Sequence, residues 1–186
     1  MDSSRRLLIL AEEKGALQYG EFTLSSGLKS NYYFDGRRLT LDSEGSVLVG
    51  RTFFDRLKTL DVTAIGGLTL GADPIVTAVT VTSYLSDKPI TGFIVRKDAK
   101  EHGTRQVIEG FLPKGSDVVI VDDVCTSGGS LFAAIDAAET AGSHVALVMV
   151  LLDRNQGGSE EIRRRGYPFY SVLKAGVDGK VGVSGL

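Results

Sequence analysis

The sequence predicts a single α/β domain built on a mostly parallel, twisted sheet flanked by helices. From residue 62 onward, short runs rich in valine and isoleucine alternate with segments of helical periodicity, as in sheets whose strands are joined by crossover helices. The run at 118–121 is wholly apolar, as expected of a parallel strand that is buried on both faces. The chain has 186 residues, of which 42% are apolar, and can therefore form one substantial core.

The N-terminal part is expected to contain two helices separated by an extended region. The first helix should run from Ser4 to Gln18, and two short extended segments, 22–27 and 31–35, should follow around a turn at Gly27. A cap at 41–43 predicts a second helix that ends near Leu60. Its expected inward-facing residues are Val47, Phe53, Phe54, Leu57 and Leu60. The aromatic residues in 22–35 could belong to the core or stack on a planar heterocycle.

Strands and helices should then alternate. The expected strands are 62–65, 90–95, 118–121 and 145–152, with an edge strand at 169–173. Pro74 marks the start of the helix that follows the first of these strands, and Ile75, Val76, Val79 and Tyr84 continue it. Ligands of such sheets bind at the carboxyl ends of the strands. The turn at 66–74 and the segment after 118–121 should therefore share one rim.

The segment 118–130 indicates an anion-binding site. The apolar run is followed by Asp122 and Asp123, and then by a small turn, rich in hydroxyl groups and glycine, that opens a helix. Free N–H groups at a helix N-terminus bind anions, and Gly128 and Gly129 would let a phosphate approach the main chain. The two carboxylates could hold sugar hydroxyls or stabilise a cation. A ribose 5-phosphate satisfies both features, although an ordinary βα unit with two solvated acids has the same pattern.

Two further segments have two interpretations each. The glycine-rich turn 66–74 could bind a pyrophosphate or could simply be a tight βα turn, and Ala72 and Asp73 exclude a Walker A motif. The polar segment 96–105 is dense in cations and contains too little apolar surface to pack. It could be a solvated charge run. It could also close over a pyrophosphate, neutralise its charge and exclude water.

These motifs together resemble those of a known family. The apolar run, acidic pair and residues 126–130 resemble the phosphoribosyl pyrophosphate (PRPP) motif of type I phosphoribosyltransferases. Arg-Lys-x-x-Lys-x-His-Gly at 96–103 resembles the catalytic loop of orotate phosphoribosyltransferases. Residues 22–35 resemble the orotate-side segment of that family, and Arg154 stands where the family places an arginine on orotate. The likeness extends from about residue 10 to 155.

The resemblance implies a fold, a reaction and an assembly. Residues 1–186 would form one type I phosphoribosyltransferase domain, with about 1–40 contributing a small hood over the base site. The enzyme would transfer the 5-phosphoribosyl group from PRPP to orotate, giving orotidine 5′-monophosphate and pyrophosphate in pyrimidine synthesis. Mg²⁺ would arrive carried mainly by PRPP, because no dedicated carboxylate cage is evident. In this family the loop reaches the neighbouring subunit's site, which implies a homodimer with shared active sites.

The resemblance also implies roles for individual residues. The catalytic residues would be Lys100, His102, Asp122 and Asp123. The PRPP-binding residues would be Arg96, Lys97, Lys100, His102, Asp122, Asp123, Val124, Cys125, Thr126, Ser127, Gly128, Gly129 and Ser130. Orotate would contact Thr126, Arg154, Tyr33 and Phe34. No residue is assigned as a metal ligand.

Departures from the family pattern leave alternatives. Some members carry a lysine where this chain has Ser25 and another where it has Gly71. The rival functions are a phosphoribosyltransferase for another base and a non-catalytic regulator that senses PRPP or nucleotides. A purine enzyme should lack the 22–35 segment and Arg154, and a regulator should lack the Lys100–His102 loop and carry a basic face.

Composition excludes several classes of partner. The net charge of −2 gives no electrostatic footprint for nucleic acid. The longest apolar run, 145–152, is too short to span a bilayer, so no membrane association is expected. One cysteine and two histidines provide neither a disulfide framework nor a set of zinc ligands, which favours a cytoplasmic protein. We expect His144 and Cys125 to be structural and Arg163–Arg165 to form a solvated helix end.

Overall fold

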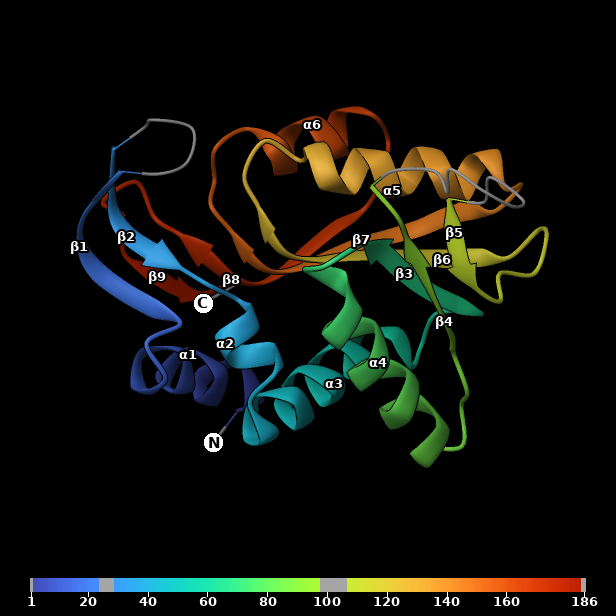
Figure 1. Ribbon diagram of the computed structural model, residues 1–186, viewed down its shortest axis with the longest axis horizontal. Helices are drawn as coiled ribbons and strands as arrows, with labels where there is room; N and C mark the ends of the chain where they lie inside the picture. Colours follow the sequence, from blue (N-terminus) through green and yellow to red (C-terminus); the bar gives the residue numbers. More distant parts are fainter. Residues whose placement is uncertain (1, 24–28, 98–106, 185–186) are drawn as a thin grey trace.

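The computed structural model describes residues 2–23, 29–97 and 107–184. In this part of the chain, seven strands form one sheet in the order β5-β4-β3-β6-β7-β8-β9 (Figure 1). They are β3 (Ala64–Leu68), β4 (Thr91–Val95), β5 (Ile108–Gly110), β6 (Asp117–Cys125), β7 (His144–Asp153), β8 (Phe169–Ala175) and β9 (Val181–Val183). The central strands pair in parallel, and only β5 and β9 at the edges are antiparallel to their neighbours. The mostly parallel sheet predicted from the sequence is confirmed.

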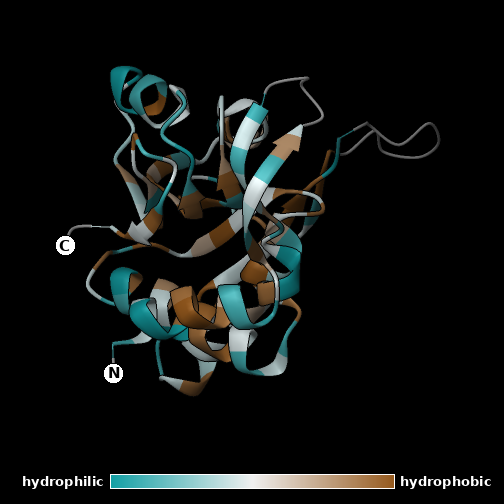
Figure 2. Ribbon diagram, turned by 90° about the vertical axis from the view of Figure 1, so that its left-hand side faces the viewer, coloured by the Kyte–Doolittle hydropathy of each residue, from teal (hydrophilic) through white to brown (hydrophobic). Residues whose placement is uncertain are grey.

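Helices cover both faces of the sheet (Figure 1). On one side lie α1 (Ser3–Glu13), α2 (Arg37–Thr40), α3 (Ser43–Leu57) and α4 (Ala72–Leu85), and on the other lie α5 (Gly129–Thr140) and α6 (Gly158–Arg164). Successive residues of β6 serve the two cores, with Val119 and Val121 in one and Val118 and Ile120 in the other. Figure 2 shows hydrophobic residues both in the strands and in the helices that pack on them. Within the described ranges, no helix is long and apolar enough to cross a membrane.

A separate hairpin lies at the β9 end of the sheet (Figure 1). It consists of β1 (Leu17–Thr23) and β2 (Lys29–Phe34), which pair antiparallel. The Tyr19 hydroxyl attaches it to the sheet by accepting a hydrogen bond of 3.1 Å from the Val181 N–H. The expected extended segments are thus present, but the prediction that the first helix reaches Gln18 is wrong. Gly15, with φ of 62°, takes the left-handed conformation that ends a helix, and the strand begins two residues later.

Two strands extend by three or more residues beyond their predicted carboxyl ends. β6 continues past Val121 to Cys125 and therefore contains both acidic residues. Asp122 lies opposite Val150 of β7, so its backbone pairs as the preceding apolar residues do, whatever its side chain. β3 likewise continues to Leu68, which reduces the expected 66–74 turn to the three residues 69–71 before α4.

The other corrections concern edges and faces. The prediction that 169–173 is an edge strand is wrong, because β9 pairs with β8 and makes it an interior strand. The short elements α2, β5 and β9 were not predicted, since three or four residues carry too little periodicity. Val47 was expected to face inward but is 48% exposed, because α3 buries the face that carries Val49, Phe53 and Leu57. Tyr84, at the end of α4, is also exposed.

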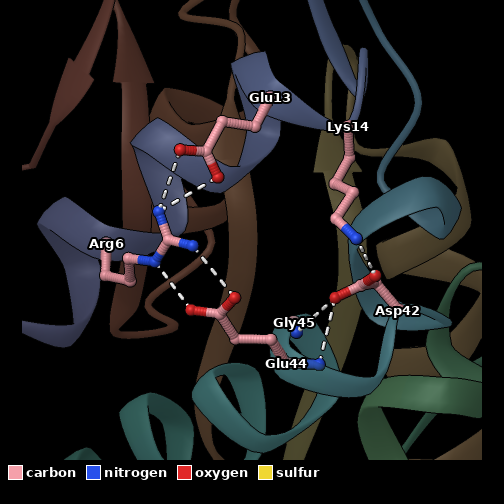
Figure 3. A network of polar contacts seen from close by, with 6 residues as sticks. All are labelled: Arg6, Glu13, Lys14, Asp42, Glu44 and Gly45. Carbon is pink, nitrogen blue, oxygen red and sulfur yellow. Dashed lines mark hydrogen bonds and ion pairs between the residues drawn. The ribbon is translucent and has the colours of Figure 1, made fainter.

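The predicted cap of α3 is confirmed, and it is part of a larger polar network (Figure 3). Asp42 is the N-cap, and its Oδ1 accepts hydrogen bonds of 3.0 Å from the N–H groups of Glu44 and Gly45. Its Oδ2 lies 2.6 Å from Lys14 Nζ, and this pairing lowers the pKa of the Asp42 carboxyl group. Arg6 contacts Glu44 at 2.6 Å in the same network. These contacts attach α1 to the first turn of α3.

We expect Asp42→Ala to lower the melting temperature by a few degrees, because it removes the cap and the Lys14 ion pair together. Thermal unfolding followed by circular dichroism measures the change. Asp55→Ala is the matched control, since Asp55 lies in the same helix and makes only an exposed ion pair with Lys58. Equal shifts in the two variants would contradict a capping role for Asp42.

Candidate active site

A cleft of about 640 Å³ lies at the carboxyl ends of the parallel strands. The hairpin, the start of α2, the β3–α4 turn, β6, the turn after β6 and the end of β7 all contribute to it. Its lining residues are Thr23, Tyr33, Phe34, Asp35, Arg37, Leu68, Thr69, Leu70, Gly71, Lys97, Asp122, Asp123, Val124, Thr126, Ser130 and Arg154. The two segments that the sequence analysis assigned to one rim therefore meet in one cleft.

A smaller pocket of about 170 Å³ adjoins the cleft at the start of α5. It is lined by Asp122, Val124 and the continuous segment 126–131. Gly128 is the N-cap of α5 with φ of 85°, a conformation that strongly favours glycine. The first turn of α5 contains no acidic residue, so its free N–H groups and dipole are available to an anion. This pocket has room for a phosphate group and offers it main-chain N–H groups and hydroxyls.

The phosphate pocket is supported from the β7–α6 segment. The carbonyl of Cys125 accepts a hydrogen bond of 2.9 Å from the Arg154 N–H, and the carbonyl of Thr126 accepts one of 3.0 Å from the Gly158 N–H. A Cβ atom at Gly158 would lie 2.6 Å from the Thr126 carbonyl oxygen, so a side chain there would displace the turn. Cys125 itself is buried, and burial with the nearby Asp153 raises the pKa of its thiol to about 12. The thiol is therefore neutral, as expected of a structural residue.

The acidic pair, Asp122 and Asp123, lines the cleft and is largely buried. Asp122 is only 6% exposed, and its Oδ1 accepts a hydrogen bond of 2.9 Å from the Asp123 N–H. Burial, followed by the charge of Asp123, raises the pKa of Asp122 to about 8. Burial also raises the pKa of Asp123. Without a ligand, the pair thus resists carrying two negative charges, and a cationic or hydrogen-bond-donating ligand would relieve the repulsion.

Two glycines allow the backbone to approach this pair. A Cβ atom at Gly36 would lie 2.6 Å from Asp123 Cβ, and one at Gly71 would collide with Asp122 Oδ1. The lysine that some family members carry at the second position therefore has no room in this arrangement. Ser25, the other departure, lies outside the described residues.

Arg154 lines the cleft immediately after the end of β7. It is buried, with 7% of its surface exposed, and its guanidinium carbon lies 4.9 Å from the centre of the Tyr32 ring. Such stacking orients the guanidinium plane while leaving its N–H groups free to bind a carboxylate. Tyr33 and Phe34, on the same hairpin strand, also line the cleft. The residues assigned to orotate, including Thr126, are thus brought together.

The residues of the basic segment are only partly described. Lys97 lines the cleft, whereas Arg96 lies in an adjoining hollow and forms an ion pair of 3.3 Å with Glu109. Lys100 and His102 lie outside the described residues. Arg96 thus contacts Glu109 through Nη1, and its assignment to the ligand stays a prediction.

Sequence reasoning missed two residues of the site. Arg37 lines the cleft, and its only signal in the sequence was its position two residues after the 31–35 segment. Gly158 was missed because its role depends on the turn that packs against it. Its position as the first residue of a short helix gives no indication of that contact.

Comparison with known proteins connects this geometry to a family. Residues 67–171 match the model of the phosphoribosyl transferase domain. An orotate phosphoribosyltransferase of Nostoc sp. is 46% identical over 85% of this chain and 77% of its own length. The crystal structure of Mycobacterium tuberculosis orotate phosphoribosyltransferase with Fe(III) dicitrate covers 92% of this chain and 96% of that one, with a TM-score of 0.81 and 38% identity. The same enzyme in complex with PRPP gives a TM-score of 0.77 and 34% identity over 94% and 96% of the two chains.

The raised pKa of Asp122 predicts a pH-dependent stability difference. Because folding favours the protonated form, the Asp122 carboxyl group destabilises the protein increasingly as pH rises from about 4, the unfolded value, to the folded value of about 8. We expect Asp122→Asn to raise the melting temperature by several degrees at pH 8 and hardly at all near pH 4. Melting curves between pH 4 and 9 test this. Asp61→Asn, at an exposed position, is the control, and a shift for Asp122→Asn that does not vary with pH would refute the prediction.

Proposed function

The chain belongs to the orotate phosphoribosyltransferases, and we propose that its cleft transfers the 5-phosphoribosyl group of PRPP to orotate. The products are orotidine 5′-monophosphate and pyrophosphate, in the synthesis of pyrimidine nucleotides. The observation that carries this proposal is one cleft that combines a phosphate pocket, a buried acidic pair and a stacked arginine. A phosphorylated sugar and an anionic planar base together match these three features.

PRPP would bind along the phosphate pocket and the acidic pair. The turn 124–130 would hold the 5′-phosphate through main-chain N–H groups and the hydroxyls of Thr126, Ser127 and Ser130. Asp122 and Asp123 would accept hydrogen bonds from the 2′- and 3′-hydroxyls of the ribose. The raised pKa of Asp122 supports this role. It shows that the two carboxyl groups lack nearby positive charge, so positive charge that develops on the ribose would stabilise them.

Orotate would bind between the hairpin and Arg154. Its carboxylate would accept charge-assisted hydrogen bonds from Arg154, and Thr126 and main-chain groups near Tyr33 and Phe34 would hold the ring edge. Uracil lacks that carboxylate, so Arg154 favours orotate over it. The hairpin residues in the cleft support the idea that about residues 1–40 act as a hood over the base.

The reaction requires charge to move from the base to the pyrophosphate. Deprotonated N1 of orotate would attack C1 of the ribose, while the bond between C1 and the pyrophosphate oxygen breaks and its electron pair leaves with pyrophosphate. The acidic pair would partly offset the positive charge that develops at C1. Lys100, His102 and Arg96 would stabilise the departing pyrophosphate, with Lys97 in support. Closure of their segment over the cleft would exclude water from the ribosyl cation.

The acidic pair also fits the Mg²⁺ that PRPP would carry. Mg²⁺ in phosphate-transferring sites is commonly held by one or two carboxylates together with substrate oxygens. The described residues contain no cluster of three or more acidic, histidine or cysteine side chains that could hold a metal. Mg²⁺ would therefore be held mainly by oxygens of PRPP, with Asp122 and Asp123 as the nearest carboxylates of this chain, and it would neutralise part of the pyrophosphate charge.

We also propose that the enzyme is a cytoplasmic homodimer with shared active sites. Beside the cleft lies a hollow of about 590 Å³, and Arg37 and Leu70 line both. Leu41, Val47 and Val81 also line this hollow and are largely exposed. An exposed apolar cluster of this kind indicates a protein interface. A second copy seated there would stand next to the cleft, as a shared site requires.

The reaction and its base specificity can be tested together. With PRPP and Mg²⁺, we expect the protein to consume orotate, followed by ultraviolet absorbance, and to leave uracil and adenine unchanged. Arg154→Ala should raise the orotate KM roughly 10- to 100-fold, the loss expected for a hydrogen-bonded ion pair. The PRPP KM should change little. Equal effects on both substrates would remove Arg154 from the base site, and turnover of adenine instead of orotate would refute the proposed function.

The shared site predicts complementation between inactive variants. Lys100→Ala and Asp123→Asn proteins should each be nearly inactive, since each loses one component of every site. After mixing and subunit exchange, about half of the dimers should be mixed, each with one intact site, so activity should recover to about a quarter of wild type. Verified exchange without recovery would mean that the segment acts on its own subunit. Mixing Lys100→Ala with Lys100→Gln, which cannot complement, is the control.

A further inference from the structure

The described part of the cleft contains three cations, which lie in different places. Arg154 stacks on Tyr32 on the side assigned to the base, and Lys97 follows the end of β4. The third is Arg37, the first residue of α2. The residue before it, Gly36, lies directly against Asp123, so Arg37 enters the cleft beside the acidic pair.

Asp35 orients the Arg37 side chain by binding its Nε. Asp35 Oδ1 accepts hydrogen bonds from the Arg37 backbone N–H at 3.2 Å and from Arg37 Nε at 3.0 Å. Among the described residues, neither Nη1 nor Nη2 of Arg37 has a hydrogen-bond partner, and the side chain is 48% exposed. Asp35 therefore fixes the orientation of the guanidinium, and Nη1 and Nη2 can donate hydrogen bonds to a ligand. A planar fork of this kind suits two phosphate oxygens.

The β3–α4 turn faces the same space without providing a cation. Thr69, Leu70 and Gly71 line the cleft, and Leu70 shares with Arg37 the boundary between the cleft and the neighbouring hollow. Gly71 is pressed against both carboxylates and has no room for a side chain. The turn can thus offer main-chain groups, but the charge that compensates an anion beside the acidic pair has to come from elsewhere.

We propose that Arg37 binds the pyrophosphate group of PRPP and of the released product, opposite the Thr69–Gly71 turn. This inference rests on the proposed function and adds a catalytic residue to it. Pyrophosphate at C1 of the ribose would lie close to Asp122 and Asp123, which repel it. Arg37 places a fixed positive charge at that point and strengthens its contact as the leaving group gains negative charge. Asp35 is then a positioning residue, since it acts by holding Arg37.

Arg38 offers a matched control in the same helix. Its Nη1 donates a hydrogen bond of 3.3 Å to the Gly15 carbonyl, and it does not line the cleft. Arg37→Gln and Arg38→Gln thus remove the same charge one residue apart. Titration calorimetry in Mg²⁺ would measure the binding of inorganic pyrophosphate and of orotidine 5′-monophosphate, which has no pyrophosphate.

We expect Arg37→Gln to weaken pyrophosphate binding roughly 10- to 100-fold, as for a lost charge-assisted contact, and to leave nucleotide binding within about twofold. Arg38→Gln should change neither. Arg37→Lys, which keeps the charge and loses the fork, should fall between wild type and Arg37→Gln. In steady-state assays, Arg37→Gln should lower kcat and raise the PRPP KM while the orotate KM stays unchanged.

Unchanged pyrophosphate binding in Arg37→Gln would overturn the assignment. An equal loss of both ligands, or a change in sedimentation relative to wild type, would also overturn it, because the substitution would then act through the fold or the dimer. Wild-type protein that binds neither ligand and does not consume orotate would refute the proposed function itself. Wild-type turnover with an unaffected Arg37→Gln variant would refute only the role of Arg37.

Discussion

Two carboxyl groups buried side by side near the end of β6 are the constraint on which the rest of the site depends. Asp122 is held in the strand by backbone pairing with β7, and it cannot move away from Asp123. Burial raises the pKa of both groups, and the charge of Asp123 raises the pKa of Asp122 further. The surrounding chain accommodates this cost with glycine where the backbone must come close and with Arg37 nearby. A ligand that brings hydroxyl donors and positive charge therefore stabilises the whole arrangement.

The parallel sheet explains why residues distant in sequence meet at this point. β3, β6 and β7 end at the same rim, so the 69–71 turn, the acidic pair and Arg154 meet although more than 80 residues separate the first from the last. Side chains on both faces of β6 are buried in the two cores. This packing fixes the position of the acidic pair relative to α5. The hairpin adds a wall that the sheet alone does not provide.

The pocket at the start of α5 and Arg154 are connected through one segment of the chain. The β7–α6 segment donates hydrogen bonds from Arg154 and Gly158 to the carbonyls of Cys125 and Thr126. The same segment thus presents the arginine assigned to orotate and supports the turn assigned to the 5′-phosphate. A displacement of Arg154 is therefore expected to displace the turn after β6 as well.

The sequence alone determined the fold class, the phosphate turn, the acidic pair and the cap of α3, because each is encoded locally. A buried strand, a glycine-rich turn and a helix start lie within thirteen residues at 118–130, and Asp42 bonds to N–H groups two and three residues away. Only the tertiary structure decided the features that depend on neighbours. β6 continues through two charged residues because β7 pairs with it, β8 is interior because β9 covers its edge, and Val47 is exposed because α3 buries another face. Likewise, Arg37 and Gly158 have no sequence signature, since a backbone contact with a distant turn or carboxylate gives each its role.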